Sequence, residues 1–289
     1  MKTNDIYKMI EDKVVSQLQN GIIPWRRCYH VSTGDVCVSH QTGNMYSPLN
    51  QMLLDEPGEY WSFEQAKREG YHIRKGAKAS QVVFWKVWSK LDKQSEEERY
   101  DHIPILKYYS VFHESDVEGL PPKLPNTFKN KNTEPIEAAE QIIKTYLDNN
   151  QDIKMVTSDR IPCFVPSEKI IHMPEKSQFD SMEDYYSTAF HEMTHSTKFA
   201  LKRPLSHNDD DRAKEELVAE IGAAFLCGHA GIEAEQVIKN NQAYCASWLQ
   251  QLRNNIKWLV WASSRAEAAY KYIVNNELPE NKSDNSAKD

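Results

Sequence analysis

Residues 185–198 read Tyr-Tyr-Ser-Thr-Ala-Phe-His-Glu-Met-Thr-His-Ser-Thr-Lys, and the organisation of the second half of the chain follows from this stretch. Two histidines, His191 and His195, stand four residues apart, and Glu192 directly follows the first. Positions four apart share one face of an α-helix, so both imidazoles can reach one metal ion. Glu192 lies on another side of the helix, where it can act as general base toward a water molecule on the metal.

A catalytic zinc site needs a third protein ligand and one open position for water. Metzincins place a histidine six residues after the second histidine of the motif. Here that place holds Leu201, so the subclass is excluded. A second predicted helix at 212–228 supplies glutamates, and we predict Glu216 as the third ligand. We assign Glu220 to hold a ligand histidine in its metal-binding tautomer.

Two alternatives to Glu216 stay open as third ligand. Glu215 is its neighbour, and His207, in a polar loop, is a weaker candidate. Glutamate pairs on helices usually form a solvated edge. Three acids in an apolar, alanine-rich helix instead favour a metal partner, because buried carboxylates need one. The sequence favours zinc, although two histidines and a glutamate accept several divalent ions.

Length, charge and cysteine usage narrow the class of protein. The 289 residues predict two domains, and the net charge of −7 excludes a globally basic nucleic-acid-binding protein. Five scattered cysteines without C-x-x-C spacing argue against a disulfide framework and for the cytoplasm. Because the chain shows neither an apolar signal segment nor a membrane-spanning run, we expect no membrane association.

The first half of the chain predicts a small α+β domain. Residues 3–20 have helical apolar spacing, Ser62–Glu69 is a capped helix, and Gln81–Trp88 and Lys107–Phe112 are strands of one hairpin. Between positions 67 and 90 seven basic residues stand against one acidic residue, with aromatic residues interleaved. Cations that follow phosphates and rings that stack on bases suit single-stranded nucleic acid, although such strand aromatics are more often core. The predicted contacts are Trp25, Arg74, Lys75, Lys78, Trp85 and Lys86.

These segments predict a two-domain α+β protein with domain 1–120, a linker at 121–135, domain 136–274 and a disordered tail at 275–289. The second domain is predicted to be mainly helical. It has a short sheet, in which residues 163–174 form a hairpin with an edge strand before the metal helix. Such an edge can bind an extended peptide by strand addition.

Over residues 5–272 the chain resembles the ArdC-type antirestriction proteins of plasmids, phages and integrative elements. In the first domain the resemblance rests on Ile23-Pro24-Trp25, on residues 42–50 (TGNMYSPLN), on residues 60–66 (YWSFEQA) and on residues 73–78 (IRKGAK). In the second it rests on residues 170–174 (IIHMP), 191–195 (HEMTH), 215–226 (EELVAEIGAAFL) and 243–249 (AYCASWL). The resemblance implies an N-terminal domain that binds single-stranded DNA and a zincin-type metallopeptidase domain.

The resulting hypothesis is an antirestriction protein that binds single-stranded DNA and carries a zinc-dependent peptidase with a possible protein or peptide substrate. One alternative is a non-catalytic DNA-coating protein with a structural metal. Another is a regulatory metalloprotease that cleaves a dedicated protein partner. The sequence leaves open which protein would be the substrate.

Overall fold

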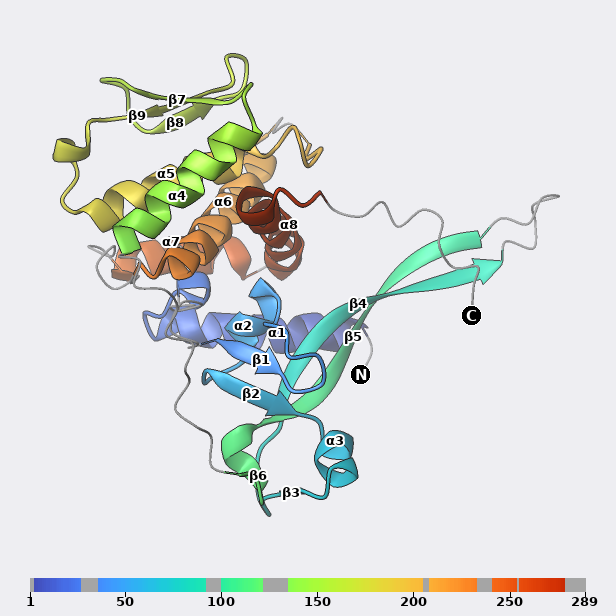
Figure 1. Ribbon diagram of the computed structural model, residues 1–289. Coiled ribbons are helices and arrows are strands. Elements are labelled where there is room, and N and C mark those ends of the chain that lie inside the picture. Colours follow the sequence, from blue (N-terminus) through green and yellow to red (C-terminus); the bar gives the residue numbers. More distant parts are fainter. Residues whose placement is uncertain are drawn as a thin grey trace. The chain divides into compact units, whose positions relative to one another are not determined.

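The computed structural model describes residues 3–26, 36–91, 100–121, 135–204, 208–232, 241–253 and 255–278, excepting the side chains of residues 26, 85–91, 100–105, 135 and 241–243. The chain divides into two compact units (Figure 1). The first comprises residues 1–27, 34–127 and 240–260, and the second comprises residues 28–33, 128–239 and 261–289. Because both combine helices with small sheets, the predicted two-domain α+β class is confirmed.

The first unit is built on a four-stranded sheet and a two-stranded sheet. Its helices are α1 (Thr3–Gln19), α2 (Pro48–Leu53), α3 (Phe63–Arg68) and α7 (Asn241–Leu252), with short 3-10 turns η1 (Pro24–Arg26) and η2 (Glu114–Asp116). Its strands are β1 (Cys37–Ser39), β2 (Gly58–Trp61), β3 (His72–Ile73), β4 (Ser80–Leu91), β5 (Tyr100–His113) and β6 (Val117–Glu118). The large sheet has the order β1-β2-β5-β4, and β3 pairs with β6.

The long antiparallel ribbon of β4 and β5 is the predicted hairpin, extended at both ends (Figure 1). Its register pairs Ser80 with Val111 and continues to the pair Leu91 and Tyr100. Helix α3 begins at the predicted Ser62 cap. The Ser62 hydroxyl accepts a hydrogen bond from the backbone N–H of Gln65. In return, the side-chain Oε1 of Gln65 accepts one from the backbone N–H of Ser62.

Helix α7 belongs by sequence to the predicted second domain at 136–274. It groups with the first unit and packs against α1, whose buried face carries the predicted apolar stripe. The Trp248 ring of α7 meets the Trp25 ring edge to face at 5.5 Å, and Trp25 is fully buried. The two tryptophans are more than 200 residues apart in sequence, so the spacing of apolar residues within one helix does not predict their contact.

In its described residues the second unit is mainly helical and contains a three-stranded sheet. Its helices are α4 (Pro135–Asn149), α5 (Met182–Ser196), α6 (Asp209–Ala230) and α8 (Ile256–Asn275), whose first residues group with the first unit. Its strands are β7 (Lys154–Thr157), β8 (Cys163–Val165) and β9 (Ile170–Met173), and η3 (Lys176–Gln178) follows them. The order is β7-β9-β8, with β7 parallel and β8 antiparallel to β9, so β8 forms the predicted edge before α5.

Within the predicted linker at 121–135, residues 122–134 lie outside the described residues, and α4 begins at Pro135. Likewise, the predicted tail lies outside the described residues from position 279 onward. Among the described helices none is both long enough and apolar enough to cross a membrane.

Candidate metal centre and nucleic-acid interface

Helix α5 carries His191, Glu192 and His195 in its C-terminal half. Ser181 caps the helix, since its hydroxyl accepts the backbone N–H of Asp184 at 3.1 Å. An apolar stripe of α5 lies in the core of the second unit, and its members are all fully buried: Tyr186, Ala189, Phe190 and Met193. This orientation leaves both imidazoles at the margin of the core, where they meet α6.

Helix α6 approaches α5 closely at Gly222. A Cβ atom at this position would lie 2.6 Å from Cγ2 and 2.7 Å from Oγ1 of Thr194, well inside normal contact distance. Thr194 is fully buried, so its side chain has little room to move aside. Glycine therefore permits the approach that places the N-terminal half of α6, with Glu215 and Glu216, against the histidines.

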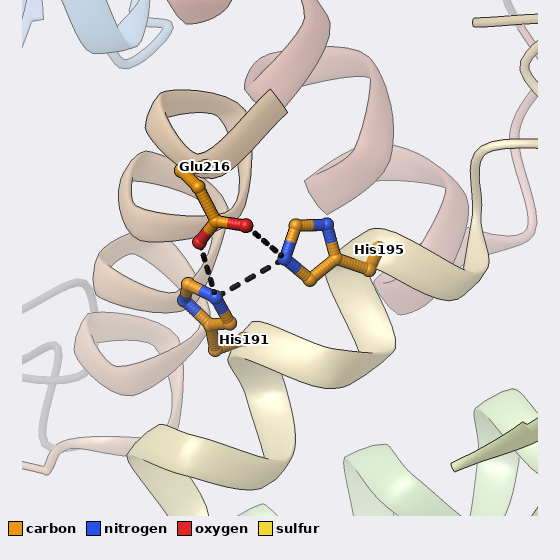
Figure 2. Close-up of side chains that lie close together, drawn as sticks. All are labelled: His191, His195 and Glu216. Carbon is orange, nitrogen blue, oxygen red and sulfur yellow. Dashed lines mark hydrogen bonds and ion pairs between the residues drawn. The ribbon is translucent and has the colours of Figure 1, made fainter. Parts of the chain in front are cut away.

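Two imidazoles and one carboxylate converge between the helices (Figure 2). The Nε2 atoms of His191 and His195 are 3.2 Å apart. Glu216 faces both rings, with Oε2 at 3.3 Å from His191 Nε2 and Oε1 at 3.5 Å from His195 Nε2. Around a tetrahedral ion with bonds of about 2.1 Å, ligand atoms are about 3.4 Å apart. The donor types and their spacing therefore fit a divalent metal.

The cluster is open to solvent on the side of Glu216, whose side chain is 54% exposed. Structural zinc sites are closed by four protein ligands, whereas catalytic sites keep a position open. In the part of the chain that the structure describes, His191, His195 and Glu216 form the one group of three or more side chains spaced to hold a metal ion. Accessibility and ligand number thus suit a catalytic site better than a structural one.

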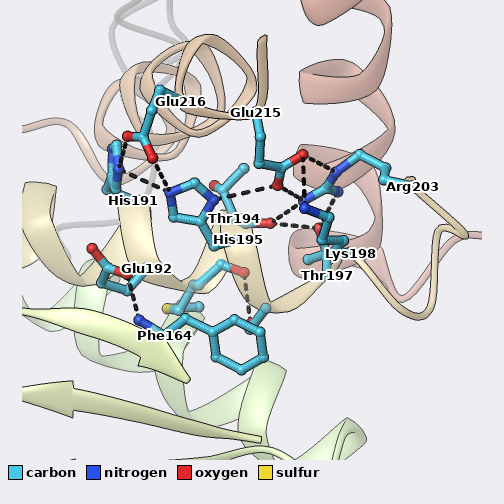
Figure 3. A network of polar contacts seen from close by, with 12 residues as sticks. Phe164, His191, Glu192, Thr194, His195, Thr197, Lys198, Arg203, Glu215 and Glu216 are labelled. Atoms are coloured by element: carbon cyan, nitrogen blue, oxygen red, sulfur yellow. Dashed lines mark hydrogen bonds and ion pairs between the residues drawn. The ribbon is translucent and has the colours of Figure 1, made fainter. Parts of the chain in front are cut away.

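Glu215, the alternative third ligand, faces the other nitrogen of His195 (Figure 3). Its Oε1 lies 3.3 Å from His195 Nδ1 and accepts a hydrogen bond of 2.8 Å from Arg203 Nη2. Glu216 therefore stands on the side where a metal would lie, and Glu215 stands behind the ring. The sequence assigned the histidine-holding contact to Glu220, whereas the contact to Nδ1 of His195 is made by Glu215. His207 lies outside the described residues.

The carboxylates and the imidazole perturb one another electrostatically. Burial alone would lower the pKa of His195, but hydrogen bonds to Glu215 and Glu216 raise it to about 9. Burial alone would raise the pKa of Glu215, but His195 and Arg203 lower it to about 2. Hydrogen bonds from His191 and His195 hold the pKa of Glu216 well below its usual range. The carboxylates are therefore ionised at neutral pH, and the negative charge of Glu216 favours a cation at the cluster.

Glu192 is buried and points toward the edge strand rather than into the cluster. Its Oε2 accepts the backbone N–H of Phe164 in β8 at 2.7 Å. Phe164 pairs with Ile171 of β9. Because its backbone N–H donates to Glu192, this N–H points away from β9, toward the unpaired edge of the sheet. The open edge of the sheet thus fixes the carboxylate of Glu192, the residue that directly follows His191.

The predicted DNA contacts of the first unit have different surroundings. Trp25 is fully buried, so the prediction that it stacks on a base is not compatible with its place in the core. Lys75 and Lys78 are exposed, and Arg74 is exposed but forms an ion pair with Asp116. The side chains of Trp85 and Lys86 lie outside the described residues.

The structure reveals an aromatic pair on the β4–β5 ribbon that sequence reasoning missed. The rings of Phe84 and Tyr109 are stacked, with centroids 4.6 Å apart and planes 7° apart. Tyr109 is 60% exposed, and Lys107, opposite Phe84 in the register, is also exposed. Side chains of directly paired residues share one face of a sheet, so an aromatic platform and a cation lie on the same face. The register of the hairpin would have predicted this face.

Two family models match the chain. The N-terminal domain of anti-restriction factor ArdC matches residues 4–112, and the zincin-like metallopeptidase matches residues 137–265. Among curated proteins, the DNA primase TraC of Escherichia coli is 28% identical over 296 residues, covering 93% of this chain. The chain spans only 20% of the length of that primase.

Solved structures agree with the family models. The metal-free antirestriction protein ArdC from plasmid R388 is 26% identical with a TM-score of 0.71, covering 95% of this chain and 100% of that one. Its Mn(II)-bound structure is 26% identical with a TM-score of 0.67, covering 92% of this chain and 96% of that one. The resemblance drawn from the motifs is confirmed, and the zincin-like domain with its Mn(II)-bound neighbour indicates a divalent metal.

Proposed function

Since the chain has both domains and the fold of the ArdC-type antirestriction proteins, we propose that it is an antirestriction protein with two activities. Its first unit binds single-stranded DNA, and its second unit is a zinc-dependent peptidase. We further propose that it acts in the reducing cytoplasm, because the cysteines in the described part of the chain are free thiols.

The convergence of His191, His195 and Glu216 carries the peptidase half of the proposal. Two histidines and a glutamate are a ligand set of zinc peptidases, and they leave one position for water or substrate. Spacings of 3.2–3.5 Å between the ligand atoms match a tetrahedral ion. Zinc is commonly tetrahedral in proteins, and its d-electrons do not favour any other geometry. The tetrahedral spacing therefore supports zinc among the divalent metals.

Glu192 and the edge strand β8 supply the remaining parts of a peptidase. When bound, zinc would polarise the peptide carbonyl and make an adjacent water more acidic. The Glu192 carboxylate would accept the proton of that water, and the Phe164 N–H holds this carboxylate at the edge strand. An extended peptide that adds to the open edge of β8 runs beside Glu192, so its backbone passes the metal cluster.

The substitution Glu192→Gln tests the peptidase half, because it keeps the shape of the side chain and removes the base. Wild type and variant are loaded with zinc and incubated with a tryptic peptide library, and new termini are counted by mass spectrometry. The proposal expects termini that wild type generates and Glu192→Gln does not, with equal zinc content in both. The same termini from both proteins, or none from wild type, would contradict it and favour a non-catalytic metal.

The DNA-binding half is supported by the stacked pair Phe84 and Tyr109 together with exposed cations. Aromatic faces stack on unpaired bases of any sequence, and lysines attract the phosphates between them. Tyr109 presents its ring to solvent, with Lys107 on the same face of the ribbon. Lys75 and Lys78 add exposed positive charge in the turn before β4. A local patch of this kind can bind DNA despite the negative net charge of the chain.

Binding of a fluorescent oligo-dT to the full chain tests this half. The proposal expects an affinity that falls steeply with added salt and that drops when Lys75 and Lys78 are both changed to Glu. Matched replacement of the exposed lysines Lys144 and Lys271 in the second unit, each changed to Glu, serves as the charge control. Salt-independent binding, or equal loss in both double variants, would contradict a specific interface in the first unit.

A further inference from the structure

A buried ion pair lies behind the metal cluster, on the side of His195 that faces away from the proposed metal position (Figure 3). Both oxygens of Glu215 are engaged. Oε1 contacts His195 Nδ1 at 3.3 Å and Arg203 Nη2 at 2.8 Å, and Oε2 accepts from Arg203 Nε at 3.2 Å. Only 9% of the Glu215 side chain and 2% of the Arg203 side chain are exposed. The pair is therefore largely removed from water.

Arg203 connects three segments of the second unit. Besides Glu215 on α6, its Nη1 donates to Thr197 Oγ1 at 2.7 Å and its Nη2 donates to the Thr194 carbonyl at 2.8 Å. Thr194 lies in the last turn of α5, where a cation is favoured by unpaired carbonyl groups. A planar guanidinium can serve these partners at once, and the ammonium of lysine cannot reproduce that fork. Arg203 thus ties α6 to the end of α5 beside the His195 ring, while Lys198 Nζ, 4.0 Å from Glu215 Oε2, is a second and more distant cation.

We infer that Arg203 is a positioning residue for the metal site, acting through Glu215 on His195. This inference rests on the proposed metal site. With Glu215 accepting the Nδ1–H of His195, the neutral imidazole that binds a metal turns its Nε2 lone pair toward His191 and Glu216. Arg203 fixes the direction of the Glu215 carboxylate and balances its charge. Carboxylates that hold ligand histidines in this way fix ring orientation and metal affinity.

An ion pair that only stabilises the fold would behave differently from one that positions His195. Replacing both members of a buried pair by neutral side chains of similar size is often without cost to stability. The double variant Arg203→Met, Glu215→Gln therefore separates the two roles. A purely structural pair predicts that both stability and metal affinity return in the double variant. A positioning role predicts that stability returns while metal affinity stays low.

Titration of the metal-free full chain with Co²⁺, followed by visible absorption and chelator competition, is the test. Arg203→Lys, Glu215→Gln and the double variant are expected to bind Co²⁺ about 10- to 100-fold more weakly, with altered absorption bands. Arg212→Lys is the control, because Arg212 is an exposed arginine on α6 that pairs with Asp209. Thermal unfolding of the metal-free proteins is measured in parallel.

Wild-type affinity and an unchanged spectrum in Arg203→Lys and in the double variant would overturn the inference. If Arg203→Lys does not fold, the double variant alone decides the question by its affinity. Failure of the wild type to bind Co²⁺ would instead refute the metal site itself, and the role of Arg203 with it. Loss of affinity in the variants, with a normal Arg212→Lys control, supports the inference even if no peptide is ever cleaved.

Discussion

Gly222→Ala perturbs the metal centre from a residue that touches none of its ligands. The new methyl group would lie 2.6 Å from Thr194 Cγ2, whereas carbon atoms normally approach to about 3.5–4.0 Å. The helices must therefore separate locally by about 1 Å, because Thr194 is fully buried and its hydroxyl bonds the Phe190 carbonyl at 2.8 Å. Overpacking of this kind costs about 1–3 kcal/mol, offset by up to about 1 kcal/mol from the better helix propensity of alanine.

The displacement reaches the metal ligands along α6. Glu216 lies six residues before Gly222, or about 9 Å along the helix, so a rigid shift of α6 carries its carboxylate away from α5. Metal–ligand distances are tolerated within about 0.2 Å, so a 1 Å shift is several times too large. We expect zinc affinity to fall at least about tenfold, which corresponds to about 1.4 kcal/mol of binding free energy.

Chelator competition for zinc and thermal unfolding of the metal-free protein measure the two effects. The double variant Gly222→Ala, Thr194→Ala removes the two closest atoms and leaves Cβ of Thr194 at 3.2 Å from the new methyl group, so most of the affinity should return. Thr194→Ala alone completes the double-mutant cycle. If Gly222→Ala keeps wild-type zinc affinity and melting temperature, the close approach at Gly222 does not position the site and the reasoning is refuted.

Three further predictions concern single features. Tyr109→Ala removes the exposed ring and should weaken oligo-dT binding by about 1–3 kcal/mol. The control is Phe63→Ala, which removes another exposed aromatic ring and should leave binding unchanged. Equal effects of the two substitutions would argue against the aromatic platform. Phe164→Pro removes the backbone N–H that donates to Glu192 and should slow peptide cleavage by about 10- to 100-fold with zinc retained. Phe164→Ala keeps this N–H and serves as the control. Equal cleavage rates in the two variants would contradict the role of the N–H. The pKa of His195 is raised to about 9 without metal, so zinc binding at neutral pH should displace a proton from this imidazole. Zinc affinity should therefore weaken as pH falls. Calorimetry in two buffers that shows no proton release would contradict this.

The local part of the site was predictable from the sequence. The spacing of His191, Glu192 and His195 fixes their places on one helix, because helical periodicity depends only on nearby residues. Glu216 followed from the need for a third ligand on a second helix, and the structure brings it to both imidazoles. The edge strand β8 before α5 was predictable for the same reason, since its hairpin with β9 is local.

The remaining features depend on contacts between distant segments. Whether Glu215 or Glu220 reaches His195 is set by the rotation of α6 against α5, which the approach at Gly222 determines. Arg203 lies between the helices with no periodic signal to mark it. Trp25 looked like a nucleic-acid contact in sequence, but its partner Trp248 lies in a helix far along the chain and buries it. Such choices are made by tertiary packing, which overrides local pattern.

The central claim is that His191, His195 and Glu216 hold one divalent metal, and metal content per chain tests it most directly. Wild type, Glu216→Ala and the exposed control Glu137→Ala are purified without added metal and analysed by mass spectrometry for bound elements. We expect close to one zinc per chain in wild type and control, and almost none in Glu216→Ala, with all three folded by circular dichroism. No metal in the folded wild type, or equal metal in Glu216→Ala, would contradict the site.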